Sequence, residues 1–349
     1  MIFNYMALIF LMLFSIVSEA SPRPDSHAPI SVMGDHIHKK GEVMFSYRYM
    51  SMSMQGNRSG KLDLTPQEIA TGTPNLFAGQ PMMPTTLRVV PTKMTMSMHM
   101  LGAMYAPSDQ LTLMAMANIV EKKMDHITFM GGSGSNILGN FSTNTKGFGD
   151  LSLSGLIRIL SSANHNAHLT VGLSLPTGSI KKNDGILTPM NMRPNVILPY
   201  PMQLGSGTVD AIAGITYSGS HGGLSWGGQT RSILRSGNNS RGYSLGDEHT
   251  AQAWLSSLIN SQISVSLRTT YFHRSNIKNI DSEIMLPVQS ADPNRQKINR
   301  LDIGVGLNFI FPNNRNRLAI EYVIPMYQEL AGPQLKNDWG ITVGWQLLL

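Results

Sequence analysis

Apolar and polar residues alternate with a period of two along most of this chain. In Leu301–Phe309, an aliphatic or aromatic residue occupies every second position, and Asp, Gly or Asn occupies the others. The segment Trp339–Leu349 repeats the pattern with both tryptophans on its apolar face. A helix would spread these residues around its circumference, so the period predicts strands with one apolar face. Such strands, with aromatic residues on the apolar face, are typical of transmembrane β-barrels.

About twelve such segments can be placed, each near the ~10 residues that a tilted membrane-spanning strand needs. They are 42–54, 94–105, 110–119, 147–160, 167–176, 207–218, 223–234, 249–259, 262–272, 299–311, 316–326 and 338–349. Short connections such as 106–109 alternate with long ones such as 177–206. This alternation predicts an all-β fold, a single antiparallel up-and-down transmembrane barrel of about 12 strands.

The beginning of the chain predicts export. The apolar run Ala7–Phe14 precedes Ser18-Glu19-Ala20, a small-x-small cleavage pattern, although no Lys or Arg precedes the run. We therefore expect a signal peptide at 1–20, a periplasmic N-terminal segment at 21–41 and the barrel at 42–349. The predicted location is the bacterial outer membrane.

Composition narrows the possible partners. Charged residues make up 14% of the chain, below the quarter that is usual for soluble proteins, and there is no cysteine. The net charge of +6 is scattered rather than gathered into a basic stripe, so no nucleic-acid partner is expected. The basic residues either solubilise loops or attract anionic lipopolysaccharide and solutes. Outer-membrane lipid and lipopolysaccharide are the expected surroundings.

The 24 methionines are dense in the first half of the chain, and their orientation is a separate question. In 94–105, five methionines share one face and Thr95, Ser97 and His99 share the other, so polarity predicts that these methionines face lipid. In 42–54, Arg48 shares a face with methionines. Either Met50–Met54 line the lumen or a bulge switches the register.

Charged residues within the strands are expected to face a wet or paired interior. They are Arg48, Asp150, Arg158, His168, Arg231, Arg268, Arg300, Asp302, Arg317 and Glu321. Such a set can select solutes, or it can form an Arg–carboxylate ladder that braces a narrow barrel. We favour bracing for most of them.

One stretch has metal-ligand chemistry. His36 and His38 lie on one side of an extended segment next to Asp35, and His126 follows a methionine in a second group. Methionine thioethers prefer Cu(I). Copper is therefore the candidate metal for a site that Asp35, His36, His38 and His126 would form. The opposing interpretation is that methionine merely packs the lumen or faces lipid. No other cofactor and no catalytic residue is expected, since nucleophile and phosphate-loop motifs are absent.

Several stretches resemble the outer-membrane transporter-like family named for the MetA pathway of phenol degradation. They are Met33–Glu42, Ser46–Met54, His99–Asp109, Met124–Thr128, Gly147–Asp150 and Leu173–Gly178. The resemblance implies a β-barrel related to channels for hydrophobic and aromatic compounds, and no catalytic residue.

We therefore predict an outer-membrane channel that passes small hydrophobic or aromatic solutes and is not an enzyme. The alternative is a copper-associated outer-membrane protein that uses the His/Met-rich region near the N-terminus. A third possibility is a structural or adhesive barrel whose loops carry the function. A continuous apolar path through the lumen would favour the first of these.

Overall fold

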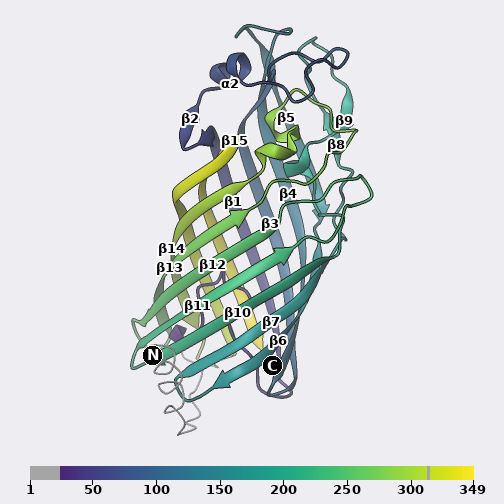
Figure 1. The fold of residues 1–349 in the computed structure, drawn as a ribbon. Helices are drawn as coiled ribbons and strands as arrows, with labels where there is room; N and C mark the ends of the chain where they lie inside the picture. Colours follow the sequence, from purple (N-terminus) through teal and green to yellow (C-terminus); the bar gives the residue numbers. More distant parts are fainter. Residues whose placement is uncertain (1–23, 313–314) are drawn as a thin grey trace, which may run out of the picture.

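A computed structural model describes residues 24–312 and 315–349, and the predicted signal peptide lies outside them (Figure 1). Each strand of the ring pairs antiparallel with its neighbours, and β15 closes the ring against β1. In ring order, the eleven strands are β1 (Val43–Gly60), β3 (Val89–Ser108), β4 (Leu111–Phe129), β6 (Leu151–Ser161), β7 (His165–Leu175), β10 (Asp210–His221), β11 (Leu224–Leu234), β12 (Glu248–Leu258), β13 (Ile263–Arg274), β14 (Ile298–Ile310) and β15 (Asn316–Leu348).

The remaining elements lie outside this ring. They are the strands β2 (Leu62–Leu64), β5 (Ile137–Phe148), β8 (Asn183–Gly185) and β9 (Asn195–Ile197), the helix α2 (Pro66–Gly72), and the single-turn 3₁₀ helices η1 (Pro24–Ser26), η2 (Tyr200–Met202), η3 (Gln289–Ala291) and η4 (Pro293–Arg295). Among the described residues, no helix is long and apolar enough to cross a membrane.

Strand β15 contains both of the last two predicted strands. Its first half pairs with β14 and its second half with β1. Trp345 Nε1 donates to Asn316 Oδ1 at 3.0 Å, although the two residues are 29 positions apart. At ~3.3 Å per residue, an extended strand would separate them by about 95 Å. β15 is therefore a hairpin whose two arms fill two neighbouring places in the ring, and Gly332, with φ of 83°, lies in the connecting stretch.

The predicted strand 147–160 is interrupted in the structure. The chain leaves β5 at Phe148 and enters β6 at Leu151. Both strands pair with β4, β5 along its later residues and β6 along its first. Asp150 lies at the break, where its carboxylate accepts from the backbone N–H groups of Gly178 at 2.9 Å and Ser206 at 2.7 Å.

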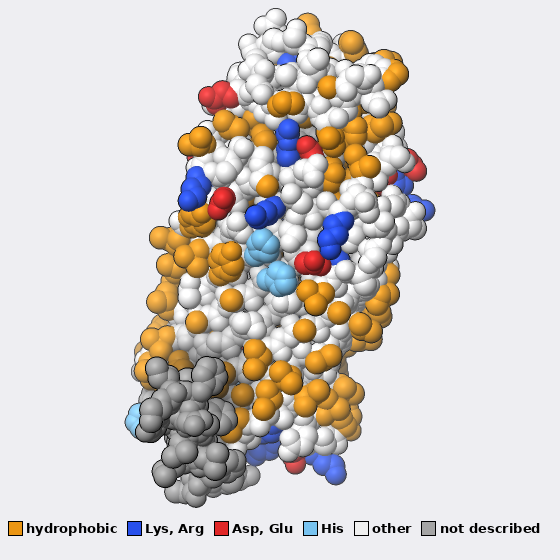
Figure 2. All heavy atoms as spheres, viewed as in Figure 1, with side chains coloured by type: hydrophobic (Ala, Val, Ile, Leu, Met, Phe, Trp, Pro, Cys, Tyr) orange, Lys and Arg blue, Asp and Glu red, His pale blue; other side chains and the backbone are white. Residues whose placement is uncertain are grey.

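The outer surface of the barrel is apolar. Leu101, Val171 and Val305 are exposed by 59, 56 and 58%, while the residues that alternate with them in the strands are more buried. Figure 2 shows hydrophobic side chains spread over the lower half of the face viewed, with charged side chains above them and at the lower end. A closed barrel pairs all its backbone groups and can carry such a belt in lipid. The protein is therefore an outer-membrane β-barrel.

Long connections gather at one end of the barrel, the upper end in Figure 1, where β2, α2, β8 and β9 lie. Arg88 organises part of this end. Its guanidinium is fully buried and donates to five backbone carbonyls, those of Ala70, Met130, Gly131, Ser133 and Gly134. A single cation thereby joins the end of α2 to the loop after β4.

Candidate functional site

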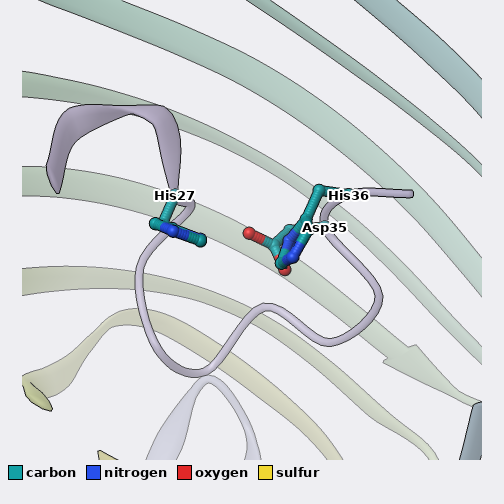
Figure 3. A group of neighbouring side chains, drawn as sticks. All are labelled: His27, Asp35 and His36. Atoms are coloured by element: carbon teal, nitrogen blue, oxygen red, sulfur yellow. The ribbon is translucent and has the colours of Figure 1, made fainter. Parts of the chain in front are cut away.

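The segment that precedes β1 lies inside the barrel. We call residues 24–41 the plug segment. Its first turn, η1, contacts β11, β12, β13 and β14, and Figure 3 shows its loop enclosed by the curve of the strands. We expected a periplasmic N-terminal segment at 21–41. In the structure its described part, residues 24–41, lies within the ring of strands, where inward side chains bind its backbone groups in place of water.

These bonds come from strands all around the ring. Strand side chains donate to plug carbonyls from Arg48 (2.9 Å to Ile30), Ser264 (2.9 Å to Pro24), Gln229 (2.9 Å to Met33) and Arg317 (2.6 Å to Ala28). Thr112 and Glu321 accept from plug N–H groups, those of His38 at 3.0 Å and Ser31 at 3.1 Å. Hydrogen bonds from strand side chains to its backbone therefore hold the plug in place. Its apolar side chains are buried as well, with Ala28 and Val32 packed against Trp254.

The ten predicted lumen residues divide into groups. Arg48, Arg317 and Glu321 bind the plug segment, and His168 Nε2 lies 2.9 Å from the Gly34 carbonyl oxygen. Two ion pairs lie in the lumen. Arg268–Glu321, at 2.7 Å, joins β13 to β15, whereas Arg300–Asp302, at 2.9 Å, lies within β14.

The remaining members have local roles or positions. Arg158 donates to Ser161 at 2.9 Å near the end of β6, and Arg231 is half-buried on β11. Asp150 fixes two loops at the break between β5 and β6, as described above. The set is therefore spread over the barrel rather than gathered in one solute site.

The methionines of 94–105 face the lumen, so their predicted orientation toward lipid is wrong. Met94, Met100 and Met104 are at most 5% exposed, whereas Leu101 and Tyr105 point outward with 59 and 48% exposure. The polar residues of the other face are accommodated outside, because His99 Nδ1 lies 2.8 Å from the Tyr47 hydroxyl. Polarity misassigned this strand because its lumen side is apolar.

The open question on 42–54 is also settled. The register of β1 shifts against β15 between Ser53 and Met54, but it runs without a shift against β3 from Val43 to Gln55. Met50, Met52 and Met54 therefore share the inward face of Arg48. Methionines of β1 pair with methionines of β3, and on the other side of β3 Met94 and Met104 pair with Met124 and Met114 of β4. We call this set the methionine wall: Met44, Met50, Met52, Met54, Met94, Met96, Met98, Met100, Met104, Met114, Met116 and Met124.

The methionine wall continues into an apolar cap under the long loops. Met94 and Met124 pack with Ile186, Leu198 and Met202 in one buried cluster. A second cluster, around Phe77, Tyr200, Tyr243 and Ile284, lies among the loops. Phe141 and Leu286 pack against both clusters, so the two are continuous. At the other end, a small cavity separates the wall from the plug and is lined by Gly34, Asp35, Met44, Ser46, Arg48, Gly102, Met104, Met114 and Met116.

The structure divides the predicted metal ligands. Asp35 and His36 lie together, and the ring of His38 is 4.7 Å from that of His36. His126 instead stacks on Phe141, with 4.5 Å between ring centroids. Thr112 binds the plug at His38, and the stretch of β4 from Thr112 to His126 is about 45 Å long at ~3.3 Å per residue. His126 therefore cannot share an ion with the other three, because the plug and the outer part of β4 are far apart.

His27 joins the group in place of His126. One ligand atom each from His27, Asp35 and His36 lie within 4.8 Å of one another (Figure 3). We did not predict His27, although three histidines within 27–38, outside any predicted strand, were a usable signal.

Burial controls the protonation of this group. It lowers the pKa of His27 well below its usual value, and the charge of Arg317 lowers it further. Burial also lowers the pKa of His38 to about 4. For Asp35, burial raises the pKa, but the charges of His36, His27 and Arg317 outweigh it and hold the pKa well below its usual range. At neutral pH the group therefore presents a carboxylate with neutral His27 and His38 rings.

No protein-family model matches this chain, and no curated protein matches it in sequence. Solved structures do match. The COG4313 outer membrane channel from Pseudomonas putida F1 has a TM-score of 0.58 at 16% identity, over 90% of this chain and 98% of that chain. The Pseudomonas putida toluene transporter TodX has a TM-score of 0.44 at 8% identity, over 89 and 90% of the two chains. A Pseudomonas aeruginosa FadL homologue has a TM-score of 0.41 at 9% identity, over 88 and 90%.

At this level of identity the likeness concerns the fold. The chain has the fold of an outer-membrane β-barrel channel.

Proposed function

We propose that the protein passes small hydrophobic or aromatic molecules across the outer membrane, along the methionine wall. The observation that carries the proposal is the row of inward methionines on β1, β3 and β4 that lies between the apolar cap under the long loops and the cavity beside the plug segment. The fold of an outer membrane channel supports passage as the general function. The resemblance to the family named for the MetA pathway of phenol degradation agrees with aromatic solutes.

Methionine suits this role for two physical reasons. Its side chain is unbranched and flexible, so a wall of methionines can reshape itself around solutes of different outline. Its thioether makes favourable contacts with aromatic rings, worth about 0.3–1.5 kcal/mol each. A solute held by many weak contacts of this kind can move along the wall without a deep binding minimum. The inward Arg, Asp and Glu residues then serve mainly to brace the barrel and seat the plug.

The expected result of making the wall polar is a loss of uptake. In the variant Met98→Gln/Met100→Gln, two adjacent inward methionines become polar side chains of similar length. Burying an apolar solute against them loses roughly 1–2 kcal/mol, so uptake is expected to fall roughly five- to thirtyfold. The measurement is the initial uptake rate of a radiolabelled alkylbenzene into vesicles whose outer leaflet carries lipopolysaccharide.

The matched control is Thr95→Gln/Ser97→Gln, which alters the outward positions of the same strand and is expected to leave uptake unchanged. Equal uptake by the wall variant and the wild type would show that solutes do not pass along the methionine wall. Uptake by the wild type no faster than through protein-free vesicles would instead favour a structural or adhesive barrel, whose loops carry the function.

A further inference from the structure

His27, Asp35 and His36 form a group that solute passage does not use. His27 follows η1, and Asp35 and His36 lie at the far end of the same loop (Figure 3). Their ligand atoms lie within 4.8 Å of one another. Around a tetrahedral ion with bonds of about 2.0–2.2 Å, ligand atoms lie about 3.4 Å apart. Small side-chain rotations are therefore enough to bring all three onto one ion.

Unsatisfied ring nitrogens give a second and independent observation. Within the described part of the chain, His27 Nδ1 and His38 Nε2 are buried and have no hydrogen-bond partner. Buried polar atoms are normally paired, and an exception calls for an explanation such as an ion. A neutral imidazole nitrogen with a free lone pair is also the form of histidine that coordinates metals.

The charge on Asp35 points the same way. One oxygen, Oδ2, accepts from the Ala28 N–H at 3.1 Å, and the other, Oδ1, lies 2.9 Å from His36 Nδ1. Arg317 does not take up this carboxylate, because its guanidinium binds Asn308, Gln346 and the Ala28 carbonyl. A buried carboxylate is stabilised by a cation bound directly to it, and a metal ion would supply that direct contact, which Arg317 and Arg48 do not make.

The donor set indicates the class of ion. Two imidazoles and one carboxylate suit a borderline divalent transition metal such as Zn(II), with an open position for water or a further ligand. The ring of His38, 4.7 Å from that of His36, is within reach of that position. Cu(I) would instead require the thioethers of the methionine wall.

We propose that the plug segment binds one borderline divalent metal ion through His27, Asp35 and His36. Since the ligands lie at the two ends of one loop, the ion closes that loop and fixes the fold of the plug inside the lumen. The site adds to solute passage and does not depend on it.

The test is calorimetric titration of the purified full-length mature protein in detergent with Zn(II), and separately with Cu(I). The wild type is expected to bind one Zn(II) per barrel. The variant His27→Gln/His36→Gln is expected to bind at least about tenfold more weakly, since it loses two ligands. Asp35→Asn, whose amide oxygen can still accept from Ala28, is expected to weaken binding similarly. It serves as the second variant if the first misfolds.

The matched control is His249→Gln/His273→Gln. These histidines face each other across β12 and β13, with ring centroids 6.0 Å apart, and lie away from the plug. This variant is expected to bind Zn(II) as the wild type does. Loss of binding in the control but not in the plug variants would overturn the proposal. The absence of saturable Zn(II) binding would also overturn it. So would a protein that binds only Cu(I) and keeps that binding in both plug variants. Solute uptake is measured separately, so failure of either proposal leaves the other to be judged by its own assay.

Discussion

Oxidation of the variant Ser31→Cys/Thr342→Cys is expected to stop solute uptake, and reduction is expected to restore it. The hydroxyl oxygens of Ser31 in the plug segment and Thr342 in β15 lie 3.1 Å apart, so cysteines at the two positions place their sulfur atoms close together, and a small shift brings them to bonding distance. The chain has no cysteine of its own, so only this bridge can form within it. Because the plug and the methionine wall line the same narrow cavity, passage of a solute along the wall, as we propose it, requires the plug to shift.

The size of the effect follows from what the bridge replaces. The native bonds of the plug are individually worth only about 0.5–1.5 kcal/mol and can exchange with water, whereas a disulfide holds under these conditions. Uptake of the alkylbenzene is expected to fall on the order of tenfold or more on oxidation. The two single-cysteine variants, treated with the same oxidant, control for thiol modification. Equal uptake by the oxidised and reduced proteins would show that the plug stays in place during passage and that the route lies elsewhere.

Replacement of Glu321 by alanine is expected to cause a large loss of stability. Glu321 is fully buried, binds Arg268 Nε at 2.7 Å and accepts from the Ser31 N–H at 3.1 Å. Its removal leaves a buried guanidinium without its counter-charge, which typically costs about 3–5 kcal/mol. The measurement is the free energy of unfolding in guanidinium chloride in detergent micelles. Loosening of the plug is expected as well, detectable as faster proteolysis of residues 24–41.

Asp63→Asn provides the comparison, because Arg58 and Asp63 form an ion pair of similar length, 2.6 Å, at an exposed position. Exposed pairs contribute about 0–1 kcal/mol, so this variant is expected to unfold close to the wild type. If Glu321→Ala were no more destabilising than Asp63→Asn, the pair would not brace the barrel and our assignment of the lumen charges would be wrong.

The fold was predictable because membrane strands expose their period directly. A strand that faces lipid on one side and polar groups on the other must alternate apolar and polar residues, as Leu301–Phe309 does. The short and long connections then show which end of the barrel each turn belongs to. The alternation of apolar and polar residues does not predict the break at Asp150 or the point at which the chain turns back within β15. At Asp150, bonds to Gly178 and Ser206 decide the geometry, and these residues lie far away in sequence.

The lumen was harder to predict than the wall. The rule that apolar residues face lipid fails where the interior is itself apolar, as it is beside Met94 and Met100. The plug segment has no periodicity, since it forms no strand and is held by bonds from its backbone to distant side chains such as Arg317. Asp35 and His36 could be grouped from the sequence because they are neighbours in it. His27 could not, because its position beside them depends on the path of the loop.

Photoaffinity labelling tests the central claim, that aromatic solutes move along the methionine wall, most directly. A small aryl diazirine would be photolysed with the protein in vesicles carrying lipopolysaccharide, and the labelled residues would be mapped by mass spectrometry. We predict labels on inward residues such as Met98, Met100 and Met116 that excess unlabelled alkylbenzene suppresses. Labels confined to lipid-facing residues such as Leu101 and Tyr105, or labels on the wall that the competitor does not reduce, would contradict the account.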